Sequence, residues 1–249
     1  MRGKMTSLFG IPYEGRVNFS RGASLGPAHT RFWLESNEDF SPYQGKELSY
    51  SELGDLYPPS GLSGEEFVAW CKEALKSWEI EPPFLALGGD HTITLPLCLY
   101  LREKVGEFPV VWLDAHLDAR NDYQGERFCH ATVARRLRDE GFDVLSLGWR
   151  SLAPGEEGPE EKDVLERLSS LKKCYLSLDL DVLDPSVFPG ISNPEPGGMS
   201  FGDLMGFILG MEGKLIAADM VEYNPREDCG PSSGGVAATL ARELLILMG

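Results

Sequence analysis

The sequence lacks any long hydrophobic run. None of its apolar stretches reaches the roughly 18–20 residues that a helix needs to cross a bilayer. Residues 1–9 include two basic residues but no extended apolar core and no small-residue cleavage site, so they make a poor signal peptide. The sequence therefore indicates a protein that neither spans nor enters a membrane.

Cysteine is scarce, and its pattern excludes two common uses. The five cysteines stand at positions 71, 98, 129, 174 and 229, and no two of them form a Cys-x-x-Cys pair. An odd number at wide spacing argues against a disulfide framework and favours a reduced, cytoplasmic chain. Cys98 and Cys174 lie within apolar segments, so we expect them to be small buried core residues.

Basic residues are also few relative to acids. The chain has 23 lysines and arginines against 39 aspartates and glutamates, for a formal net charge of −16. Phosphate binding needs a basic surface, so nucleic acid is excluded as a partner. An acidic surface attracts small cationic substrates, although solubility alone would also account for it.

Short apolar segments alternate with amphipathic ones along most of the chain. We expect strands at residues 5–11, 83–87, 109–114, 143–147, 174–180 and 214–222, and helices at 27–36, 63–78, 95–105, 130–140, 159–171, 201–210 and 235–248. Several strands are apolar on both faces, which is typical of a parallel sheet covered by helices on both sides. Without a repeat or linker, the sequence predicts a single three-layer α/β domain over residues 1–249.

The helix at 63–78 has the clearest start signal. Ser63 precedes it and Glu66 follows three residues later, which is the pattern of a capping box.

Acids and histidines are concentrated in three short motifs, each directly after an expected strand. They are Gly-Gly-Asp-His at 88–91, Asp-Ala-His-Leu-Asp at 114–118 and Asp-Leu-Asp at 179–181. In an extended chain, residues two apart point to the same side, so the paired acids and histidines can face one point. Open parallel sheets bind ligands at the carboxyl ends of their strands, where all three motifs lie.

These motifs favour a metal site. Six oxygen and nitrogen donors without cysteine suit hard or borderline divalent metals and are enough for two ions that share carboxylates. A lone Asp-x-Asp pair often caps a turn, and the pair at 179–181 is also compatible with a phosphotransferase that uses an aspartate nucleophile. That class expects a phosphate-binding loop or a lysine partner, and neither is clear in this sequence.

In order and spacing, the three motifs resemble those of the ureohydrolase family, which includes arginase and agmatinase. The resemblance is carried by the motifs at 88–91 and 114–118 and by Ser-Leu-Asp-Leu-Asp-Val-Leu-Asp-Pro at 177–185. It continues at residues 10–13, 188–190, 194–198 and 221–225, and so covers most of the chain. It implies an arginase-like fold, two Mn²⁺ ions and a small cationic guanidino substrate.

The resemblance also implies a role for each motif residue. For one manganese ion the terminal ligands would be His91 and Asp118, for the other His116 and Asp181, and the bridging carboxylates would be Asp114 and Asp179. Three further acids are expected to support the ligands or to form turns, namely Asp90, Asp184 and Asp219. His29 is the one histidine outside the motifs and their matches, and we expect it to be structural.

Two more residues match catalytic groups of the family. Glu222 matches the acid that holds the guanidinium through paired, charge-assisted hydrogen bonds. The two metals would lower the pKa of a shared water and supply hydroxide to attack the guanidinium carbon. His130 matches the histidine that transfers protons and, with Asp118 as a relay, would protonate the leaving amine. The products would be urea and a primary amine.

The loop at 119–130 indicates which guanidino compound is the substrate. Its Tyr-x-Gly-Glu-x-x-x-His-Ala pattern resembles agmatinases rather than the asparagine- and serine-bearing loop of arginases. We therefore expect agmatine, hydrolysed to putrescine, or aminopropylagmatine, hydrolysed to spermidine. Asp122 or Glu126 would face the second cationic end. Arginine or another guanidino acid is the alternative.

Two alternatives to a ureohydrolase belong to other functional classes. A metal-dependent deacetylase on a related fold would need a catalytic tyrosine and adjacent histidines, and the chain has no adjacent histidines. A catalytically silent metal-binding scaffold would be expected to lose ligands, whereas the ligand set is intact. The resemblance further implies a homo-oligomer, either a trimer or a hexamer, although the chain is shorter than usual for agmatinases.

Overall fold

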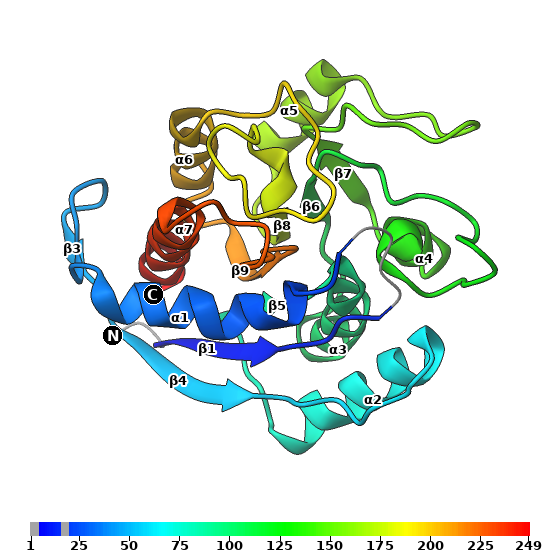
Figure 1. Cartoon of the computed structure of the whole chain (residues 1–249), viewed down its shortest axis with the longest axis horizontal. Coiled ribbons are helices and arrows are strands. Elements are labelled where there is room, and N and C mark those ends of the chain that lie inside the picture. The colour runs from blue at the N-terminus through cyan, green and yellow to red at the C-terminus, as the bar shows by residue number, and fades with distance from the viewer. Residues whose placement is uncertain (1–4, 16–19) are drawn as a thin grey trace.

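The computed structural model describes residues 5–15 and 20–249, and its centre is a seven-stranded sheet (Figure 1). The strand order is β4-β1-β5-β9-β8-β6-β7, and every pairing is parallel. The strands are β1 (Thr6–Ile11), β4 (Tyr50–Asp55), β5 (Phe84–Gly88), β6 (Val110–Leu113), β7 (Val144–Leu147), β8 (Cys174–Asp179) and β9 (Leu215–Val221).

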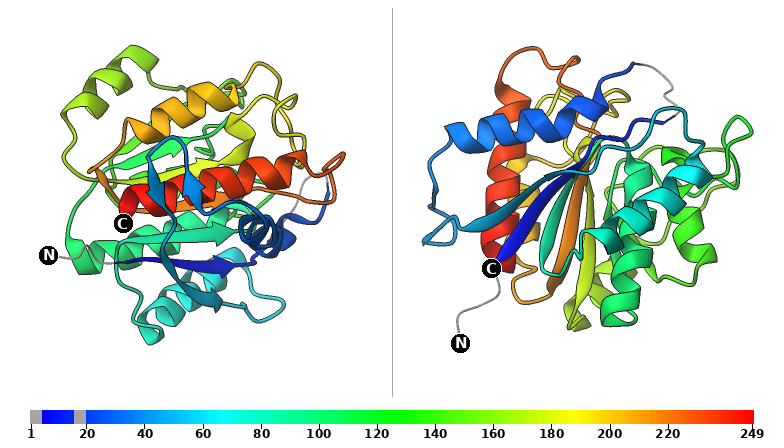
Figure 2. Two further views of the ribbon diagram at one scale, coloured as in Figure 1. Left: turned by 90° about the vertical axis from the view of Figure 1, so that its left-hand side faces the viewer. Right: turned by 90° about the horizontal axis from the view of Figure 1, so that it is seen from below.

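Helices cover both faces of this sheet, as the right-hand view of Figure 2 shows. The helices of one face are α1 (Gly26–Ser36), α5 (Glu161–Ser170), α6 (Phe201–Leu209) and α7 (Ser232–Met248). Those of the other face are α2 (Gly64–Ser77), α3 (Thr94–Val105) and α4 (Val133–Asp139). The predicted three-layer α/β architecture is therefore confirmed.

The central strands are apolar on both sides because each side packs into its own core. In β6, Val111 and Leu113 enter the core beneath α5, α6 and α7. The alternate residues Val110 and Trp112 enter the core beneath α2, α3 and α4. This alternation explains the unbroken apolar runs in the sequence.

Most predicted elements are found within three residues of their expected ends, and the Ser63–Glu66 capping box is present. Strand β4 was not predicted, because it lies at the sheet edge and its sequence is largely polar and exposed. The short antiparallel pair β2 (Phe40–Ser41) and β3 (Lys46–Glu47) was also missed. The segment predicted as one helix at 130–140 begins with a 3-10 turn, His130–Thr132, before α4.

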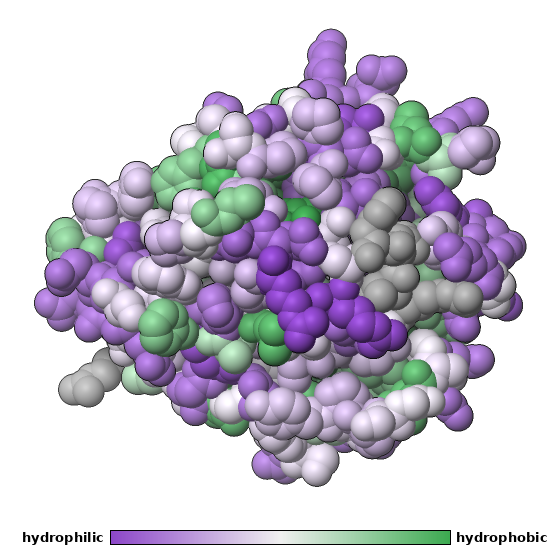
Figure 3. Space-filling view, in the orientation of Figure 1, coloured by the Kyte–Doolittle hydropathy of each residue, from purple (hydrophilic) through white to green (hydrophobic). Residues whose placement is uncertain are grey.

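The remaining predictions about the chain concern its surface and thiols. All five cysteines are free, and Cys98 and Cys174 are buried. No helix within the described residues is both long and apolar enough to cross a membrane. Residues 1–4 of the N-terminal segment lie outside the described residues. The face drawn in Figure 3 is mostly hydrophilic, with small separate apolar patches.

Because all seven strands run in the same direction, their carboxyl ends meet at one edge. The three motifs follow β5, β6 and β8, and Glu222 follows β9. These four strands are consecutive neighbours in the sheet. The fold therefore brings residues from 88 to 222 together at one place.

Candidate metal centre

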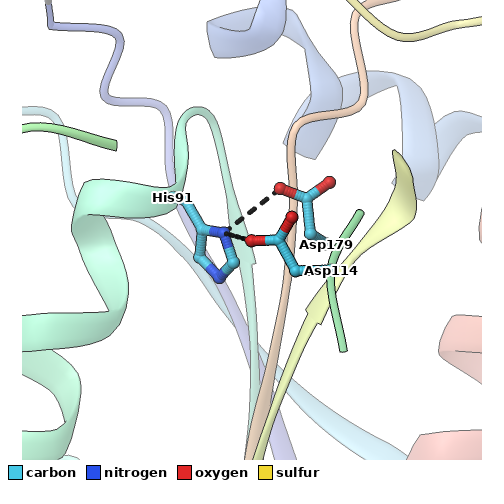
Figure 4. Close-up of side chains that lie close together, drawn as sticks. All are labelled: His91, Asp114 and Asp179. Atoms are coloured by element: carbon cyan, nitrogen blue, oxygen red, sulfur yellow. Dashed lines mark ion pairs between the residues drawn. The ribbon is translucent and has the colours of Figure 1, made fainter. Parts of the chain in front are cut away.

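Three carboxylates surround one ring nitrogen of His91. Its Nδ1 atom lies 3.2 Å from Asp114 Oδ2 and 3.1 Å from Asp179 Oδ2 (Figure 4). Asp118 Oδ2 lies 3.5 Å from the same nitrogen. His91 and Asp114 are fully buried, and Asp179 is nearly so. The ends of β5, β6 and β8 thus supply one compact group of donors.

The other side of the ring determines which nitrogen faces the carboxylates. Ser177 donates its hydroxyl hydrogen to Asp219 Oδ1 at 2.8 Å, so it accepts a hydrogen bond from His91 Nε2, also at 2.8 Å. The indole of Trp112 stacks on the imidazole, with ring centroids 3.9 Å apart. Nε2 therefore carries a proton, and Nδ1, which faces the carboxylates, is the nitrogen left to bind a metal once the ring is neutral.

A second group forms around His116. Its Nδ1 atom lies 2.8 Å from Asp181 Oδ2 and 3.5 Å from Asp114 Oδ1. Its Nε2 atom lies 3.0 Å from the side-chain amide of Asn193. Asp114 thus belongs to both groups, with Oδ2 toward His91 and Oδ1 toward His116. This is the arrangement expected of a bridging carboxylate.

Asp179 is placed less symmetrically. Its Oδ2 atom faces His91, whereas its Oδ1 atom accepts a hydrogen bond from the main-chain nitrogen of Asp181 at 2.8 Å. The groups whose donor atoms lie close enough together to hold an ion are His91, Asp114 and Asp179, and Asp114, His116 and Asp181. A bridge through Asp179 therefore stays a prediction from the resemblance.

The donors fit divalent cations by chemistry and by charge. Burial, together with the nearby charges of Asp181 and Asp114, raises the pKa of Asp179 well above its usual range. Burial and Asp114 likewise raise the pKa of Asp118 to about 7. The buried Nδ1 of His91 makes no hydrogen bond with any described residue. Cations at this place would satisfy that nitrogen and relieve the repulsion between the carboxylates.

The pKa values of the two imidazoles are raised as well, because the same carboxylates surround them. Burial alone would lower the pKa of His116, but its contacts with Asp114 and Asp181 raise it to about 12. The pKa of His91 is also raised against the effect of burial, through Asp114, Asp118 and Asp179. Without metal, both rings therefore hold protons that a metal ion must displace.

Two of the predicted site residues have a strained backbone. Asp118 has φ 48° and Glu222 has φ 66°, in the left-handed region that residues other than glycine seldom adopt. Such conformations persist where the surrounding structure requires them and are concentrated at functional sites. The strain therefore supports a functional role for both acids.

Glu222 lies beside the first group of donors. Its Oε1 atom accepts a hydrogen bond from the main-chain nitrogen of His91 at 2.8 Å. Burial, followed by the charge of Asp90, raises the pKa of Glu222 well above its usual range. A guanidinium bound here would favour the ionised carboxylate and pair with it. The position fits the predicted role in substrate binding.

A pocket opens over both groups and is lined by His130 as well as Glu222. Burial lowers the pKa of His130, so its imidazole is neutral at pH 7. Asp122 and Glu126, expected to face the second end of the substrate, do not line this pocket. Glu14 and Glu156 line it instead.

Three acids near the motifs, and His29, mainly make contacts that support the surrounding structure. Asp90 accepts hydrogen bonds from the main-chain nitrogens of Gly15 and Thr92. Asp184 accepts them from Ser186, Gly197 and Gly198, and these bonds lower its pKa to about 2. Asp219 supports His91 through Ser177. His29 lies near the Tyr223 hydroxyl, outside the pocket lining.

Sequence reasoning missed several residues that complete the site. Trp112 and Ser177 each stand two positions before a predicted bridging aspartate, so strand alternation could have placed them on the same side as the ligands. Asn193, Glu14 and Glu156 lie in loops, and no periodic signal indicates where a loop side chain points.

The chain is similar to known proteins over most of its length. The chain matches the model of the Arginase family over residues 4–166 and 159–247. It is 32% identical to arginase 2 (chloroplastic/mitochondrial) of Arabidopsis thaliana, over 98% of this chain and 80% of that protein. It is 31% identical to the N(1)-aminopropylagmatine ureohydrolase of Thermus thermophilus, over 86% of this chain and 81% of that protein.

A solved structure of a related protein has the same fold. The agmatine ureohydrolase of Thermoplasma volcanium superimposes with a TM-score of 0.82 at 26% identity, covering 96% of this chain and 88% of that one. The relatives differ in the substrates that their names state, at similar identity, so similarity alone does not separate arginine from agmatine. The chain belongs to the arginase family of ureohydrolases, which are metal-dependent amidinohydrolases.

Proposed function

We propose that this protein hydrolyses a guanidino group to urea and a primary amine with two Mn²⁺ ions, and that its substrate is agmatine or aminopropylagmatine. The observation that carries the proposal is the position of Asp114. Its two carboxylate oxygens face two different imidazoles, and Glu222 is hydrogen-bonded to the main chain of one of them.

In this proposal the chain holds the metals and orients the substrate. The ions, held by the six predicted ligands, would supply hydroxide from a shared water near neutral pH. Glu222 binds the cationic guanidinium and fixes the position of its carbon, which replaces a chance encounter by a bound geometry. Asp114, Asp179 and Asp181 are almost fully buried, so bulk water has little access to their carboxylates.

His130 moves the proton in this scheme. Burial lowers the pKa of His130, so the neutral imidazole can accept the proton that the attacking water loses and deliver it to the nitrogen of the leaving amine. Asp118 stays the predicted relay.

The charges of the pocket support a substrate with two cationic ends. Seven of the 19 described lining residues are acids, and Arg120 is the one lysine or arginine among those 19. Glu156 lines the pocket from the loop after β7, where it accepts hydrogen bonds from the main-chain nitrogens of Ala119 and Ala153. We propose that Glu156 or Glu14 replaces Asp122 and Glu126 as the acid near the second ammonium group.

One observation favours the alternative, a guanidino acid such as arginine. The Arg120 guanidinium lies 4.8 Å from the centre of the Tyr123 ring, and both residues line the pocket. A substrate carboxylate could pair with this arginine.

Urea release from four guanidino compounds decides between an agmatine-type substrate and a guanidino acid. The manganese-loaded protein is incubated with agmatine, aminopropylagmatine, arginine and guanidinobutyrate. We expect the highest kcat/KM for agmatine or aminopropylagmatine. Glu156→Gln should raise KM for agmatine and leave KM for guanidinobutyrate nearly unchanged, with Asp122→Asn as the matched control. Preferential hydrolysis of arginine would contradict the agmatine proposal.

The metal content separates the enzyme from a silent scaffold. We expect close to two Mn²⁺ per chain, and no binding at saturating metal would defeat the proposal. Acetyl-lysine included in the same assays tests the deacetylase alternative, for which we expect no product.

We also propose that the chain works in the cytoplasm as a homo-oligomer of three or six subunits, as the family resemblance implies. Mass photometry of the purified protein checks the subunit number, and a monomer at working concentration would contradict it.

A further inference from the structure

Arg150 follows β7 and is hydrogen-bonded to the motif at 114–118 through its main chain. Its nitrogen donates to the carbonyl oxygen of Ala115 at 2.8 Å, and Ser151 donates to the same oxygen at 3.0 Å. Ala115 lies between Asp114 and His116, and its own nitrogen donates to Asp181 Oδ1 at 2.8 Å. The backbone at Arg150 thus holds the short segment that presents two candidate ligands.

The guanidinium of Arg150 reaches two other segments. Nη2 donates to the carbonyl oxygens of Asp181 at 2.7 Å and Leu183 at 3.3 Å. Nη2 and Nε both donate to the carbonyl oxygen of Glu195, at 2.6 and 3.1 Å. Further bonds of 3.2–3.4 Å run to the carbonyl oxygens of Gly148, Val182 and Pro196. Within the described residues, every hydrogen bond of this guanidinium ends on a main-chain carbonyl.

The glycines at 197 and 198 allow this arrangement. A Cβ atom on Gly198 would lie 2.7 Å from Arg150 Nη2 and 2.5 Å from the carbonyl carbon of Leu183, closer than real side chains approach. The nitrogens of both glycines donate to Asp184 Oδ2. The loop at 193–198 therefore packs directly against the guanidinium and the segment that follows Asp181.

The three segments joined by Arg150 all belong to the His116 group. They carry Asp114 and His116, Asp181, and Asn193, whose amide lies 3.0 Å from His116 Nε2. The His91 ring is supported by different residues, Ser177 and Trp112, which Arg150 does not contact through any of these bonds. Apart from Asp114, which both halves share and which Trp112 also contacts, the His91 and His116 sides have separate supports.

We propose that Arg150 is a positioning residue for the His116 half of the metal centre, so that its loss weakens the binding of one metal ion much more than that of the other. The proposal rests on the two-metal function proposed above. A guanidinium with five donors in a fixed plane can hold several carbonyls at once, whereas the compact ammonium of lysine cannot.

The test is equilibrium binding of Mn²⁺ to the full chain, stripped of metal by chelation and followed by metal analysis after dialysis. The variants are Arg150→Lys and Arg150→Met. Arg102→Met is the matched control, because the Arg102 guanidinium also donates to a main-chain carbonyl, that of Glu140, away from the site. We expect two strong sites in the wild type and the control. We expect one strong site in the Arg150 variants, with the other weakened by about 10- to 100-fold, the usual effect of a residue that orients metal ligands.

Far-UV circular dichroism first establishes which variants fold. Equal weakening of both ions, unchanged binding of both, or failure of both Arg150 variants to fold would overturn the proposal, since a purely structural role would not separate the two affinities. If the wild type itself binds fewer than two ions, the two-metal function fails, whatever the variants do.

The rate of urea formation by the Arg150 variants is a second measurement that tests the proposal. In a folded Arg150 variant, urea formation should recover as Mn²⁺ is raised, because the missing ion is restored by mass action. A rate that stays low at full occupancy of both sites would also contradict a role through metal positioning.

Discussion

Asp114 is the residue on which both halves of the site depend. Its Oδ2 atom accepts a hydrogen bond from the indole of Trp112 at 2.9 Å and faces His91. Its Oδ1 atom accepts one from the main-chain nitrogen of His116 at 2.5 Å. Asp114 is fully buried, so its charge is compensated by these neighbours and not by bulk water.

Asp114→Asn should therefore abolish the metal centre rather than weaken one ion. The amide keeps the size of the side chain but removes its charge and turns a donor toward a neighbouring N–H or imidazole. We expect metal affinity and kcat to fall by more than the 10- to 100-fold typical of a supporting residue. Metal analysis and urea release measure both effects. Asp122→Asn, an exposed acid of the adjacent loop, is the control, and two bound ions in the Asp114 variant would refute the role.

A second prediction at the residue scale concerns the protons that His91 and His116 lose when metal binds. The pKa of His116 is raised to about 12 and that of His91 is also raised, so both rings are protonated at neutral pH when no metal is bound. Metal ligation needs the neutral ring, so binding should release protons and strengthen as pH rises. Calorimetry in buffers of different ionisation enthalpy measures the release. Heat that is independent of the buffer would count against this set of ligands.

The candidate site was predictable where its residues obey strand periodicity. Asp114 with His116, and Asp179 with Asp181, stand two residues apart at strand ends, and the structure brings them together. Arg150 and Asn193 were not predictable in the same way. Their contacts depend on the path of loops across the sheet edge, which sequence spacing does not encode.

At the scale of elements, the junction between β5 and the N-terminal loop determines where the first motif lies. Gly89 follows β5, and a Cβ atom on it would lie 1.9 Å from the carbonyl oxygen of Tyr13. Asp90 holds the same loop through the nitrogen of Gly15 at 2.7 Å. The motif at 88–91 thus needs glycine for close packing, beside the histidine that is the predicted metal ligand.

Gly89→Ala should lower the free energy of unfolding and the metal affinity together, because the clash is with main-chain atoms that cannot rotate away. We expect a loss of about 1–3 kcal/mol, as for other overpacked sites. Gly206→Ala is the matched control within α6, where nothing lies within 4 Å of the added atom. It should stabilise the chain by about 0.5–1 kcal/mol through helix propensity. Chemical denaturation measures both, and equal effects of the two substitutions would contradict the packing argument.

Elements with a buried apolar face were predictable, and the others were not. The core strands and α2 are marked by apolar runs and by the Ser63–Glu66 box. Strand β4, with the sequence Tyr-Ser-Glu-Leu-Gly-Asp, has no fully buried residue. It is a strand because β1 offers it an open edge for pairing, a tertiary cause that a local pattern does not reveal.

At the scale of the whole molecule, the excess of acids would favour the cationic substrate proposed above. The formal net charge is −16. The face drawn in Figure 3 is mostly hydrophilic, with only small apolar patches. A cationic substrate is attracted toward such a protein, and salt screens the attraction.

The value of kcat/KM for agmatine should therefore fall severalfold when the ionic strength rises from about 0.01 to about 0.2 M, since the screening length shrinks from about 30 Å to below 10 Å. Guanidinobutyrate, which has no net charge, serves as the control substrate and should change little. An equal salt effect on both substrates would show that the overall charge does not contribute to capture.

The most direct test of the two-metal account is a titration of the metal-stripped protein with Mn²⁺ while urea formation from agmatine is recorded. We predict that the rate rises with added metal and reaches its plateau only when two ions are bound per chain. Full activity with a single bound ion, or no urea from any of the guanidino substrates at saturating Mn²⁺, would contradict it.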